Sequence, residues 1–429
     1  MSSRGYQRIA VIGAGVIGVT TAYALARRGY AVTVYERQRY SAMETSYANG
    51  GQISACHTEA WNHVGTILKG LRWLCRADAP LRLNPWPGWH KYSWLAEFLA
   101  NVRNYEAHTV ALTRLAIESR EHLHEIARRE GIAFDLEPRG ILHLYRQREA
   151  FEHALRVNEL LRRGGLERYP VSAEDMQGME PALRGDFHGG LYTPSDSSGD
   201  IHRFTRGLAD VCARLGVEFR FDTQISALLA EGGCFRVREH PVLDPSRPEP
   251  ARTDCSSMDQ DGSGFDAVVV CAGVHSRRFA RQLGDRVNVY PVKGYSITVA
   301  LDDAVSRAAA PRVSLLDDEA RIVSSRLGDA RLRVAGTAEL DGFNLDIRAR
   351  RTAPLLRWVR DLFPEVATET AIPWCGLRPM MPGMLPRVGP GRRPGVFYNT
   401  GHGHLGWTLC AATAEAVARA IHAADSGHG

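Results

Sequence analysis

Glycines at positions 13, 15 and 18 have the spacing of a turn that binds phosphate groups. Gly13 permits a tight turn, Gly15 lets a pyrophosphate approach the backbone, and Gly18 lets the following helix pack against the preceding strand. The free N–H groups at the start of that helix attract anions. The predicted cofactor-binding turn consists of Gly13, Ala14, Gly15, Val16, Ile17 and Gly18.

The elements around this turn have the order of a βαβ unit, which implies a parallel sheet. Residues 8–12 are typical of a strand, residues 19–28 predict a helix, and residues 31–35 predict a second strand. The second strand ends at Glu36 and Arg37, which are both expected to contact the cofactor. A carboxylate at this place accepts hydrogen bonds from ribose hydroxyls and repels a 2′-phosphate, so NADP is disfavoured.

A second glycine-rich turn lies at residues 399–408 and opens a predicted helix over about 408–423. A helix N-terminus stabilises the negative charge that a reduced flavin carries near N1 and the C2 carbonyl, whereas NAD enzymes need no such late element. The two turns together favour FAD over NAD. The residues expected to contact FAD here are Gly401, Gly403, His404, Leu405, Gly406, Trp407 and Thr408.

Several segments resemble the D-amino-acid oxidase superfamily of FAD enzymes, and most closely its bacterial D-amino-acid dehydrogenases. The resemblance implies a Rossmann-like α/β domain that binds FAD, joined to an α+β substrate domain built on an antiparallel sheet. The segments that carry it are residues 11–18, 44–54, 291–296, and 376–379 with 399–408.

We expect both domains to be discontinuous in the sequence. The FAD-binding domain is expected at residues 1–60, 195–285 and 375–429, and the substrate domain at 61–194 and 286–374. Further predicted helices lie at about 107–130, 149–163 and 201–215, the last with Asp200 as its N-cap candidate. Further predicted strands lie at 217–221, 267–271, 289–300 and 331–335, the last two being antiparallel in type.

The resemblance also implies further cofactor positions. Ile225 matches a residue whose backbone meets the adenine, and Ala272 with Gly273 matches a turn near the pyrophosphate. Another segment passes close to the phosphates and the isoalloxazine ring, where small residues and amides let the backbone approach a flat ring. This segment contains Ser46, Ala48, Asn49, Gly50, Gly51, Gln52 and Ile53.

Arg378 is the leading candidate for binding a substrate. A guanidinium fork matches the carboxylate of an amino acid with two hydrogen bonds, although an arginine here would also suit holding a loop or the flavin. Tyr295, Ser54 and His402 are expected in the pocket wall. Further candidates are His57, His63, His202 and His404, each of which would also suit the surface or a satisfied core position.

Two departures from the family pattern bear on the chemistry. Residues 55–61 differ from the segment expected of an alanine-preferring dehydrogenase, so the preferred side chain stays open. Cys375 lies one residue out of register with the cysteine through which some sarcosine oxidases attach flavin. We therefore expect FAD to be bound non-covalently.

The bulk composition excludes several classes of protein. The chain has 429 residues with a formal charge of +5 and no clustered basic stripe, so nucleic-acid binding is not expected. Its eight cysteines lack the spacing of a zinc or redox site, which predicts buried thiols and no metal. No apolar run reaches about 20 residues and no signal peptide is evident, so we expect a cytoplasmic protein.

One region suggests contact with a membrane surface. Residues 64–76 combine apolar positions at helical spacing with three basic side chains, and Trp73, Trp86, Trp89 and Trp94 lie close in sequence. This pattern predicts peripheral contact with the inner face of the cell membrane. The same pattern is typical of a helix that packs into the substrate domain.

Together these features predict the oxidative deamination of D-amino acids, including secondary amines of the D-proline or hydroxyproline type. Hydride transfer from Cα to flavin N5 gives an imino acid, which hydrolyses to a keto acid and ammonium, and the electrons pass to a quinone or another acceptor. Two alternatives stay open: an O2-using oxidase of the glycine or sarcosine oxidase type, and the flavin subunit of a multi-subunit dehydrogenase. The second glycine-rich turn disfavours a non-catalytic NAD-binding regulator.

Overall fold

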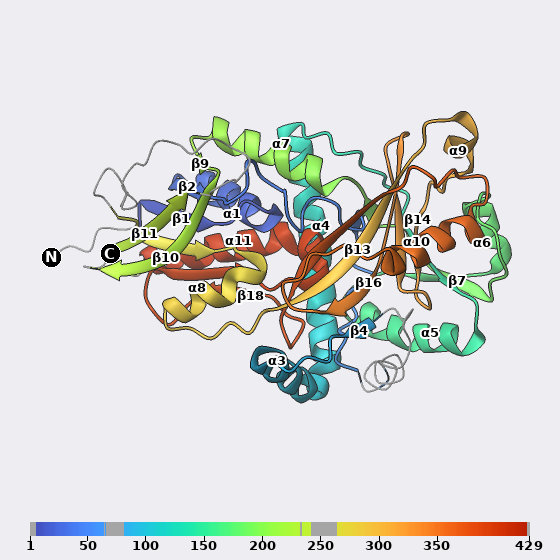
Figure 1. Ribbon diagram of the computed structural model, residues 1–429, viewed down its shortest axis with the longest axis horizontal. Coiled ribbons are helices and arrows are strands. Elements are labelled where there is room, and N and C mark those ends of the chain that lie inside the picture. The colour runs from blue at the N-terminus through green and yellow to red at the C-terminus, as the bar shows by residue number, and fades with distance from the viewer. Residues whose placement is uncertain (1–5, 64, 66–80, 232–233, 242–263, 427–429) are drawn as a thin grey trace.

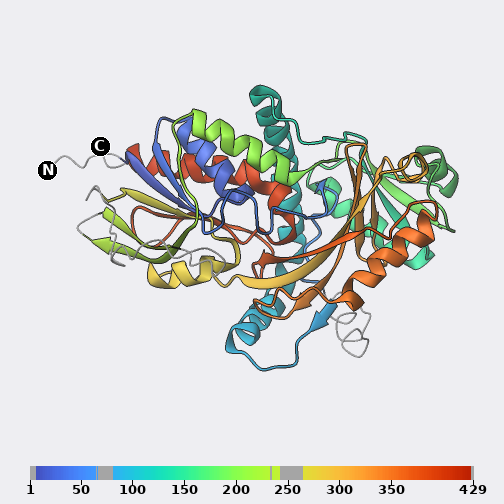
Figure 2. The same cartoon turned by 45° about the horizontal axis from the view of Figure 1, so that its top comes forward.

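Two sheets lie at opposite ends of the long axis of the molecule, with helices between and around them (Figure 1; Figure 2). The computed structural model describes residues 6–63, 65, 81–231, 234–241 and 264–426. Within these residues the chain passes several times from one sheet to the other, so each sheet collects strands that are far apart in the sequence.

The first sheet has six strands in the order β18-β19-β12-β1-β2-β9. Its strands pair in parallel except for β18, which is antiparallel to β19. The βαβ unit predicted from the first glycine turn is confirmed. The strands are β1 (Arg8–Ile12), β2 (Ala31–Tyr35), β9 (Glu218–Arg220), β12 (Ala267–Val270), β18 (Arg387–Pro390) and β19 (Val396–Thr400).

Four helices pack together beside this sheet, and α1 contacts both α11 and α7. They are α1 (Val16–Ala26), α4 (Tyr105–Glu130), α7 (Ile201–Arg214) and α11 (Gly406–Ser426). All four predicted helices in these places are confirmed. The predicted N-cap of α7 is also confirmed, because the Asp200 carboxylate accepts hydrogen bonds from the N–H groups of His202 and Arg203.

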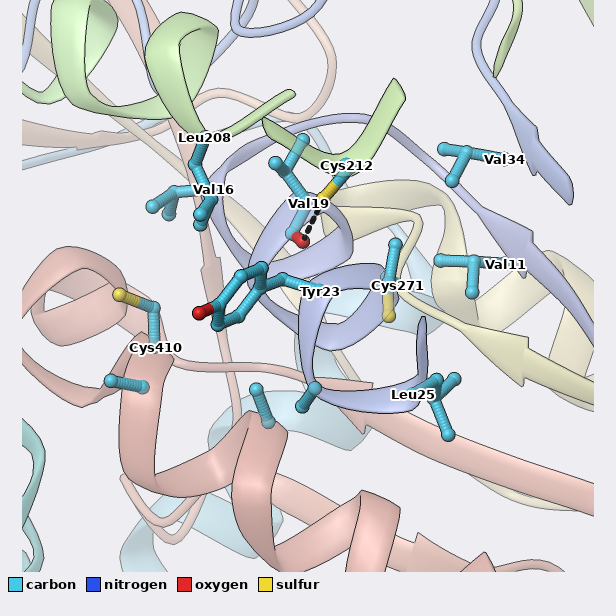
Figure 3. Packing of buried hydrophobic residues seen from close by; sticks show 14 of the residues in the cluster. Val11, Val16, Val19, Tyr23, Leu25, Val34, Leu208, Cys212, Cys271 and Cys410 are labelled. Atoms are coloured by element: carbon cyan, nitrogen blue, oxygen red, sulfur yellow. Dashed lines mark hydrogen bonds between the residues drawn. The ribbon is translucent and has the colours of Figure 1, made fainter. Parts of the chain in front are cut away.

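The side chains of α1 and its neighbours form one apolar core (Figure 3). Val19 and Leu25 of α1 are fully buried, as are Val11 of β1 and Leu208 of α7. Each such side chain contributes roughly 1.5–3 kcal/mol through burial. This core fixes the start of α1 against the sheet and so positions the glycine turn in front of it.

The second sheet is larger and mostly antiparallel, in the order β17-β13-β16-β15-β14-β5-β7-β6 with β4 beside β16. Only the β14–β5 and β16–β4 pairs are parallel. The predicted antiparallel sheet is confirmed. Its strands are β4 (Leu81–Leu83), β5 (Ile141–Tyr145), β6 (Tyr169–Val171), β7 (Gly189–Thr193), β13 (Tyr290–Ala300), β14 (Ser314–Asp317), β15 (Ile322–Leu327), β16 (Arg331–Leu340) and β17 (Ile372–Met380).

The remaining elements connect or cover the two sheets. The short strands β3 (Gln52–Ile53) and β8 (Ser197–Ser198) pair with each other, as do β10 (Thr223–Glu231) and β11 (Cys234–Pro241). The other helices are α3 (Trp89–Ala100), α5 (Arg148–Arg163), α6 (Ala173–Met179), α8 (Ser276–Gln282), α9 (Ala304–Ala309) and α10 (Ala349–Leu362). Short 3-10 turns are η1 (Asn101–Asn104), η2 (Gly273–His275) and η3 (Gly403–Leu405).

The division into an FAD-binding and a substrate domain stays a prediction, and one proposed boundary meets a difficulty. The boundary at residue 375 falls inside β17, which pairs along its whole length with β13. Residues 375–380 therefore belong to the larger sheet. After β17, the next strand of the chain in the six-stranded sheet is β18.

Candidate functional site

A cavity of about 1160 Å³ lies between the two sheets and is lined by residues from both. The first glycine turn, the segment around residues 42–61 and the start of α11 line it. Residues of β13, β16 and β17 line it from the larger sheet. A cavity of this size, shared by two sheets, has room for a ligand larger than an amino acid.

The first glycine turn forms one end of this cavity. Gly13 has a φ of 106°, and a Cβ there would lie 2.7 Å from the carbonyl oxygen of Cys271. A Cβ on Gly18 would lie 1.8 Å from the carbonyl oxygen of Gly13, so the helix can pack here only with glycine. A Cβ on Gly15 would instead meet only the Ser46 hydroxyl, at 3.4 Å. The roles expected of Gly13 and Gly18 therefore have a geometric basis, and the side-chain position at Gly15 is free apart from this one ordinary contact.

Polar groups surround the start of α1. The N–H of Val16 donates to the Ser46 hydroxyl at 3.0 Å. The Glu36 carboxylate accepts from the N–H groups of Ala14, at 2.8 Å, and Gln38, at 2.9 Å. Burial raises the pKa of Glu36 above its ordinary value, against the opposing effect of these two N–H donors. Glu36 thus lies in the cavity wall beside the turn, as the sequence pattern requires.

The second glycine turn approaches the cavity from the other side. Gly401 and Gly403 both have positive φ, and a Cβ on either would meet Met381 or Met380 at 2.6 Å or less. An isolated β-bridge joins Met380 at the end of β17 to His402. This bridge attaches the strand that carries Arg378 directly to the turn that opens α11.

His404 lies in this turn, and its ring is held on several sides. It stacks on Trp61 with ring centroids 5.0 Å apart, and its Nε2 atom lies 3.2 Å from the carbonyl oxygen of His57. Burial and the positive charge of Arg378 lower the pKa of His404 to about 4. His402 is also buried, which lowers its pKa to about 3, and its Nε2 lies 3.0 Å from the Thr413 hydroxyl.

Arg378 lines the cavity, and its side chain is partly exposed there. Its Nη1 donates to the carbonyl oxygen of Thr337 at 2.9 Å, and burial lowers its pKa to about 10. A Cβ on Gly294 would lie 2.3 Å from the Arg378 guanidinium carbon, so this glycine makes room for the side chain. Within the described part of the chain, Arg378 forms no ion pair with a carboxylate. A guanidinium in this state favours an anionic ligand.

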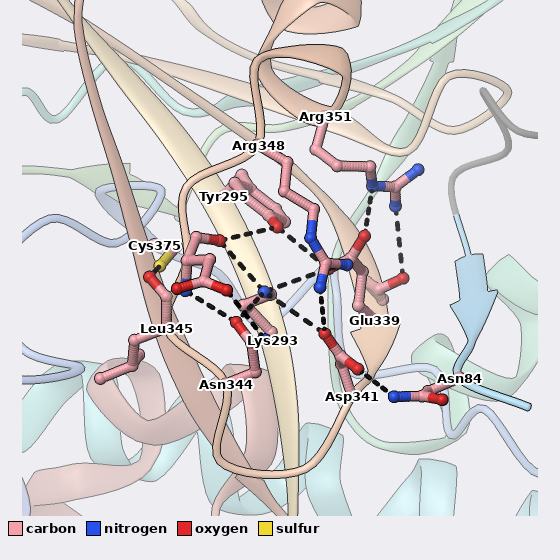
Figure 4. A network of polar contacts seen from close by, with 12 residues as sticks. Asn84, Lys293, Tyr295, Glu339, Asp341, Asn344, Leu345, Arg348, Arg351 and Cys375 are labelled. Atoms are coloured by element: carbon pink, nitrogen blue, oxygen red, sulfur yellow. Dashed lines mark hydrogen bonds and ion pairs between the residues drawn. The ribbon is translucent and has the colours of Figure 1, made fainter. Parts of the chain in front are cut away.

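Tyr295 was expected in the pocket wall, and it does line the cavity, but its hydroxyl is used elsewhere (Figure 4). The hydroxyl donates to Glu339 at 3.0 Å. Burial, together with Glu339, raises the pKa of Tyr295. Glu339 also forms buried ion pairs with Lys293, at 3.3 Å, and Arg351, at 2.9 Å. Only the ring of Tyr295 is therefore available to a ligand.

Most of the other predicted positions also line the cavity. Among the substrate candidates these are Ser54, His402 and Arg378, with His57, His63 and His404; His202 is not among the lining residues. The cofactor candidates that line it are Gly13, Gly15, Val16, Ile17, Glu36, Arg37, Ser46, Ala48, Asn49, Gly50, Gly51, Gln52, Ile225, Ala272, Gly273, Gly403, His404, Gly406 and Trp407.

Six predicted cofactor positions lie behind the lining. Ile53 and Leu405 are buried in apolar cores. The Thr408 hydroxyl accepts a hydrogen bond from the Ser54 N–H at 3.0 Å, so it supports the wall from behind. The other three are Ala14, Gly18 and Gly401, whose places are set by the backbone contacts described above.

A polar cluster in the substrate half of the cavity was not predicted. The Asp318 carboxylate accepts from His143 Nδ1, at 2.9 Å, and from the Tyr145 hydroxyl. The Nε2 of His143 lies 3.1 Å from Cys56 Sγ, and Arg168 donates to the Tyr145 hydroxyl at 3.2 Å. His143 and Tyr145 lie on one strand, β5, whereas Asp318, Cys56 and Arg168 lie in three loops that meet only in the folded protein. The one signal in the sequence is a run of polar residues at 317–319 after an apolar strand.

The cavity fits an FAD molecule on two independent observations. Gly15 leaves the start of α1 open to a phosphate, as the predicted cradle requires. Trp407 Nε1 and Gln52 Oε1 are buried in residues that line the cavity and have no hydrogen-bond partner in the described structure, so a polar ligand would satisfy them. Cys375 does not line the cavity, and its thiol donates to the Leu345 carbonyl oxygen at 3.0 Å.

Comparisons with known proteins agree with this geometry. The chain is 55% identical over 415 residues to D-amino acid dehydrogenase 3 of Mesorhizobium japonicum, covering 96% of this chain and 97% of that protein. It is 42% identical over 420 residues to D-amino acid dehydrogenase of Paramagnetospirillum magneticum, covering 96% and 94%.

Solved structures show the same fold at low identity. Glycine oxidase from Geobacillus kaustophilus superposes with a TM-score of 0.74 at 20% identity, covering 97% of this chain and 95% of that one. L-proline dehydrogenase from P. horikoshii superposes with a TM-score of 0.70 at 16% identity, covering 97% and 93%. The family described as FAD dependent oxidoreductase matches residues 8–420. The chain therefore belongs to the FAD-dependent oxidoreductases of this family, and its cofactor is FAD.

Proposed function

We propose that this protein is a D-amino-acid dehydrogenase that oxidises the Cα–N bond of D-amino acids, including secondary amines of the D-proline type. The product is an imino acid, which hydrolyses to a keto acid and ammonium. Support comes from two relatives named D-amino acid dehydrogenase that match this chain over almost its full length.

The observation that carries the proposal is the state of Arg378. Its guanidinium lies in the cavity wall, is held at one end by Thr337, and forms no ion pair in the described structure. An α-carboxylate would satisfy it with charge-assisted hydrogen bonds. A substrate held in this way places its Cα one bond from the anchored carboxylate.

The protein's contribution to the reaction is orientation and the exclusion of water. Bound FAD supplies the hydride acceptor. Arg378 fixes the carboxylate, and the ring pair of Trp61 and His404 forms a flat wall beside it. His404 is neutral at pH 7 because its pKa is about 4, so the wall adds no charge that would repel a substrate ammonium. Positioning of this kind supplies much of the rate of a hydride transfer.

We further infer that the electrons pass to a quinone at a membrane surface. Trp89, the first residue of α3, and Trp86, three residues before it, are 81% and 77% exposed, which suits an interfacial contact. Trp94 of α3 is buried, and Trp61 packs against His404, so these two tryptophans pack inside the protein and not at its surface. The segment at 64–76 lies outside the described residues except for Gly65.

No helix among the described residues is long and apolar enough to cross a membrane, so any such contact would be peripheral. A flotation assay with anionic liposomes at low and high salt tests it. The variant with Trp86 and Trp89 both changed to Ser should lose binding while keeping its FAD. Equal flotation of the two proteins would contradict a role for these side chains.

A panel of D- and L-amino acids tests the activity itself, with an artificial dye, a quinone analogue and O2 as separate acceptors. We expect oxidation of D-enantiomers with the dye and the quinone analogue and slow peroxide formation in air. Rapid peroxide formation would move the protein to the alternative of an oxidase. Activity that appears only with an added partner protein would favour a flavin subunit, and activity confined to L-enantiomers would reject the stereochemical assignment.

A further inference from the structure

The turn between β14 and β15, residues 318–321, projects polar side chains into the substrate half of the cavity. Asp318, Glu319 and Arg321 all line it. The turn follows a strand whose residues are fully enclosed, so its charged side chains lie at the end of an apolar run. Their position at the cavity, and the hydrogen bonds that Asp318 and Glu319 accept, distinguish them from solvated loop charges.

Hydrogen bonds from outside and inside the turn hold it in one conformation. The N–H of Ala320 donates to Asp317 at 2.9 Å. The N–H groups of Arg146 and Gln147 donate to Glu319, at 2.9 and 3.0 Å. Arg321 has a φ of 56°, a left-handed conformation that non-glycine residues adopt rarely. A turn fixed to this degree presents its side chains to a ligand without further ordering.

The two oxygens of Asp318 have different partners. Oδ2 accepts from His143 and Tyr145, whereas Oδ1 faces Arg321 Nη1 at 3.6 Å, which is beyond hydrogen-bonding distance. The side chains of Asp318 and Arg321 are 25% and 38% exposed. The pair therefore offers one acceptor and one donor side by side at the cavity wall, where one hydroxyl group can contact both from the cavity side.

The pair lies near the expected substrate position. Asp318 contacts His143, whose Nε2 lies 3.1 Å from Cys56 Sγ, and the ring of the next residue, His57, has its centroid 5.0 Å from that of His404. Asp318 and Arg321 also act on the His57 ring electrostatically, as Arg378 and Arg321 do on the His404 ring. A short ligand whose carboxylate binds Arg378 would pass His404 and reach the turn with its side chain.

We propose that Asp318 and Arg321 form a side-chain subsite that recognises a hydroxyl group on the substrate. This inference rests on the proposed oxidation of D-amino acids and adds the class of side chain. A hydroxyl can donate to Asp318 Oδ1 and accept from Arg321 at the same time. A cationic side chain would meet Arg321, an anionic one would meet Asp318, and an alkyl group would desolvate both without replacing their hydrogen bonds.

Matched substrate pairs that differ by one hydroxyl test the inference: D-homoserine with D-2-aminobutyrate, and 4-hydroxy-D-proline with D-proline. We expect kcat/KM to be about 10- to 100-fold higher for the hydroxylated member of at least one pair, the range for a hydrogen bond to a charged group. In Arg321→Met and Asp318→Asn this ratio should fall below about 3. Asp329→Asn is the control, because that carboxylate is 87% exposed on the next turn and should leave the ratio unchanged.

Binding without turnover provides a second measurement. α-Methylserine and 2-aminoisobutyrate have no Cα–H, so they cannot be oxidised, and they too differ by one hydroxyl. Their dissociation constants from the holoenzyme, followed by flavin absorbance, should differ by about 10-fold in the wild type and by less than about 3-fold in Arg321→Met. The subsite would be overturned, and the proposed function left intact, by two results together: oxidation of D-amino acids with no preference for a hydroxyl group, and equal dissociation constants for this pair. No oxidation of any D-amino acid would overturn the proposed function instead.

Discussion

The Nε2 atom of His404 lies 3.2 Å from the carbonyl oxygen of His57, and this contact fixes the tautomer of His404. A carbonyl oxygen can only accept, so the proton of the neutral ring is on Nε2 and the lone pair is on Nδ1. Since the pKa of His404 is about 4, the ring stays neutral at pH 7. The cavity wall beside Arg378 therefore contains a hydrogen-bond acceptor that keeps its form over the physiological pH range.

His404→Phe should lower kcat/KM because it removes this acceptor next to the anchored carboxylate. The substrate ammonium is attached to the same carbon as the carboxylate, so we expect it to donate to Nδ1. The loss at pH 7 should be about 10- to 100-fold, the worth of a hydrogen bond to a charged group. The pH profile of kcat/KM is the measurement, and the loss should shrink as the pH approaches the pKa of the free substrate amine. A loss that is constant with pH would indicate a packing role alone.

Gly15→Ala should abolish FAD binding without unfolding the protein. A methyl group there meets only the Ser46 hydroxyl, at 3.4 Å, so the fold has room for it, whereas a bound pyrophosphate would not. Gly18→Ala is the comparison, because its methyl group would lie 1.8 Å from the Gly13 carbonyl oxygen and should prevent folding. Flavin absorbance and thermal unfolding separate the two. A Gly15→Ala protein with stoichiometric FAD would show that the phosphates pass elsewhere.

Arg378→Met should raise KM sharply and reduce kcat/KM by about 2–4 kcal/mol in transition-state stabilisation, the range for truncating a buried charge partner. FAD content should be unchanged if Arg378 serves the substrate. Arg348→Met is a suitable control, since that arginine pairs with Asp341 at 2.8 Å in the network behind Tyr295. Loss of flavin from Arg378→Met would instead assign this arginine to the cofactor.

The buried histidines should make the protein less stable in acid. Burial lowers the pKa of His402 from 6.5 to about 3, so below pH 6.5 the unfolded chain takes up a proton that the folded chain does not. The free energy of unfolding should therefore be highest above pH 6.5 and fall as the pH is lowered towards about 3. From pH 7.5 to 5.0 His402 alone should account for about 2 kcal/mol. Urea denaturation of the wild type and of His402→Gln measures this, and equal losses in both would exclude His402 as the cause.

FAD should leave the protein on denaturation, because we expect it to be bound non-covalently. Cys375, the residue nearest to a covalent position in the sequence, donates its thiol proton to the Leu345 carbonyl oxygen and does not line the cavity. Acid precipitation of the wild type and of Cys375→Ser should release all the flavin into the supernatant in both cases. Flavin fluorescence that stays with the precipitated wild type, and not with Cys375→Ser, would show a covalent bond.

Local patterns were sufficient to predict the cofactor half of the fold. The glycine turns, the strands beside them and the N-cap at Asp200 depend on contacts between residues close in sequence or on a backbone conformation that one residue type favours. The strand at Ile141–Tyr145 was not predicted, because all five of its residues are buried and it shows no alternation. Helix α10 was not predicted either, because it contains Pro354 and a proline usually ends or kinks a helix.

The substrate half of the site was harder to predict for the same physical reason. His143 and Asp318 are hydrogen-bonded across 175 positions of sequence, and they meet only because β5 pairs with β14. Nothing in the sequence indicates that Gly294 leaves space for the Arg378 side chain. Tyr295 lies in the pocket wall as expected, but nothing in the sequence indicated that its hydroxyl binds Glu339. Burial of Lys293 and Arg351 requires a compact set of acceptors around them, and Glu339 is one of these.

The β-bridge between Met380 and His402 determines how well the site tolerates change elsewhere. It joins the strand of Arg378 to the turn that opens α11 within a few residues of both. The bridge therefore sets the distance between a carboxylate bound to Arg378 and a flavin ring bound at that turn, because only a few backbone residues connect the two. Mutations that loosen the outer strands of either sheet should lower the melting temperature of the protein while the catalytic alignment stays the same. Directed evolution could alter the remote surfaces freely, and residues 378–406 would be the segment to leave intact.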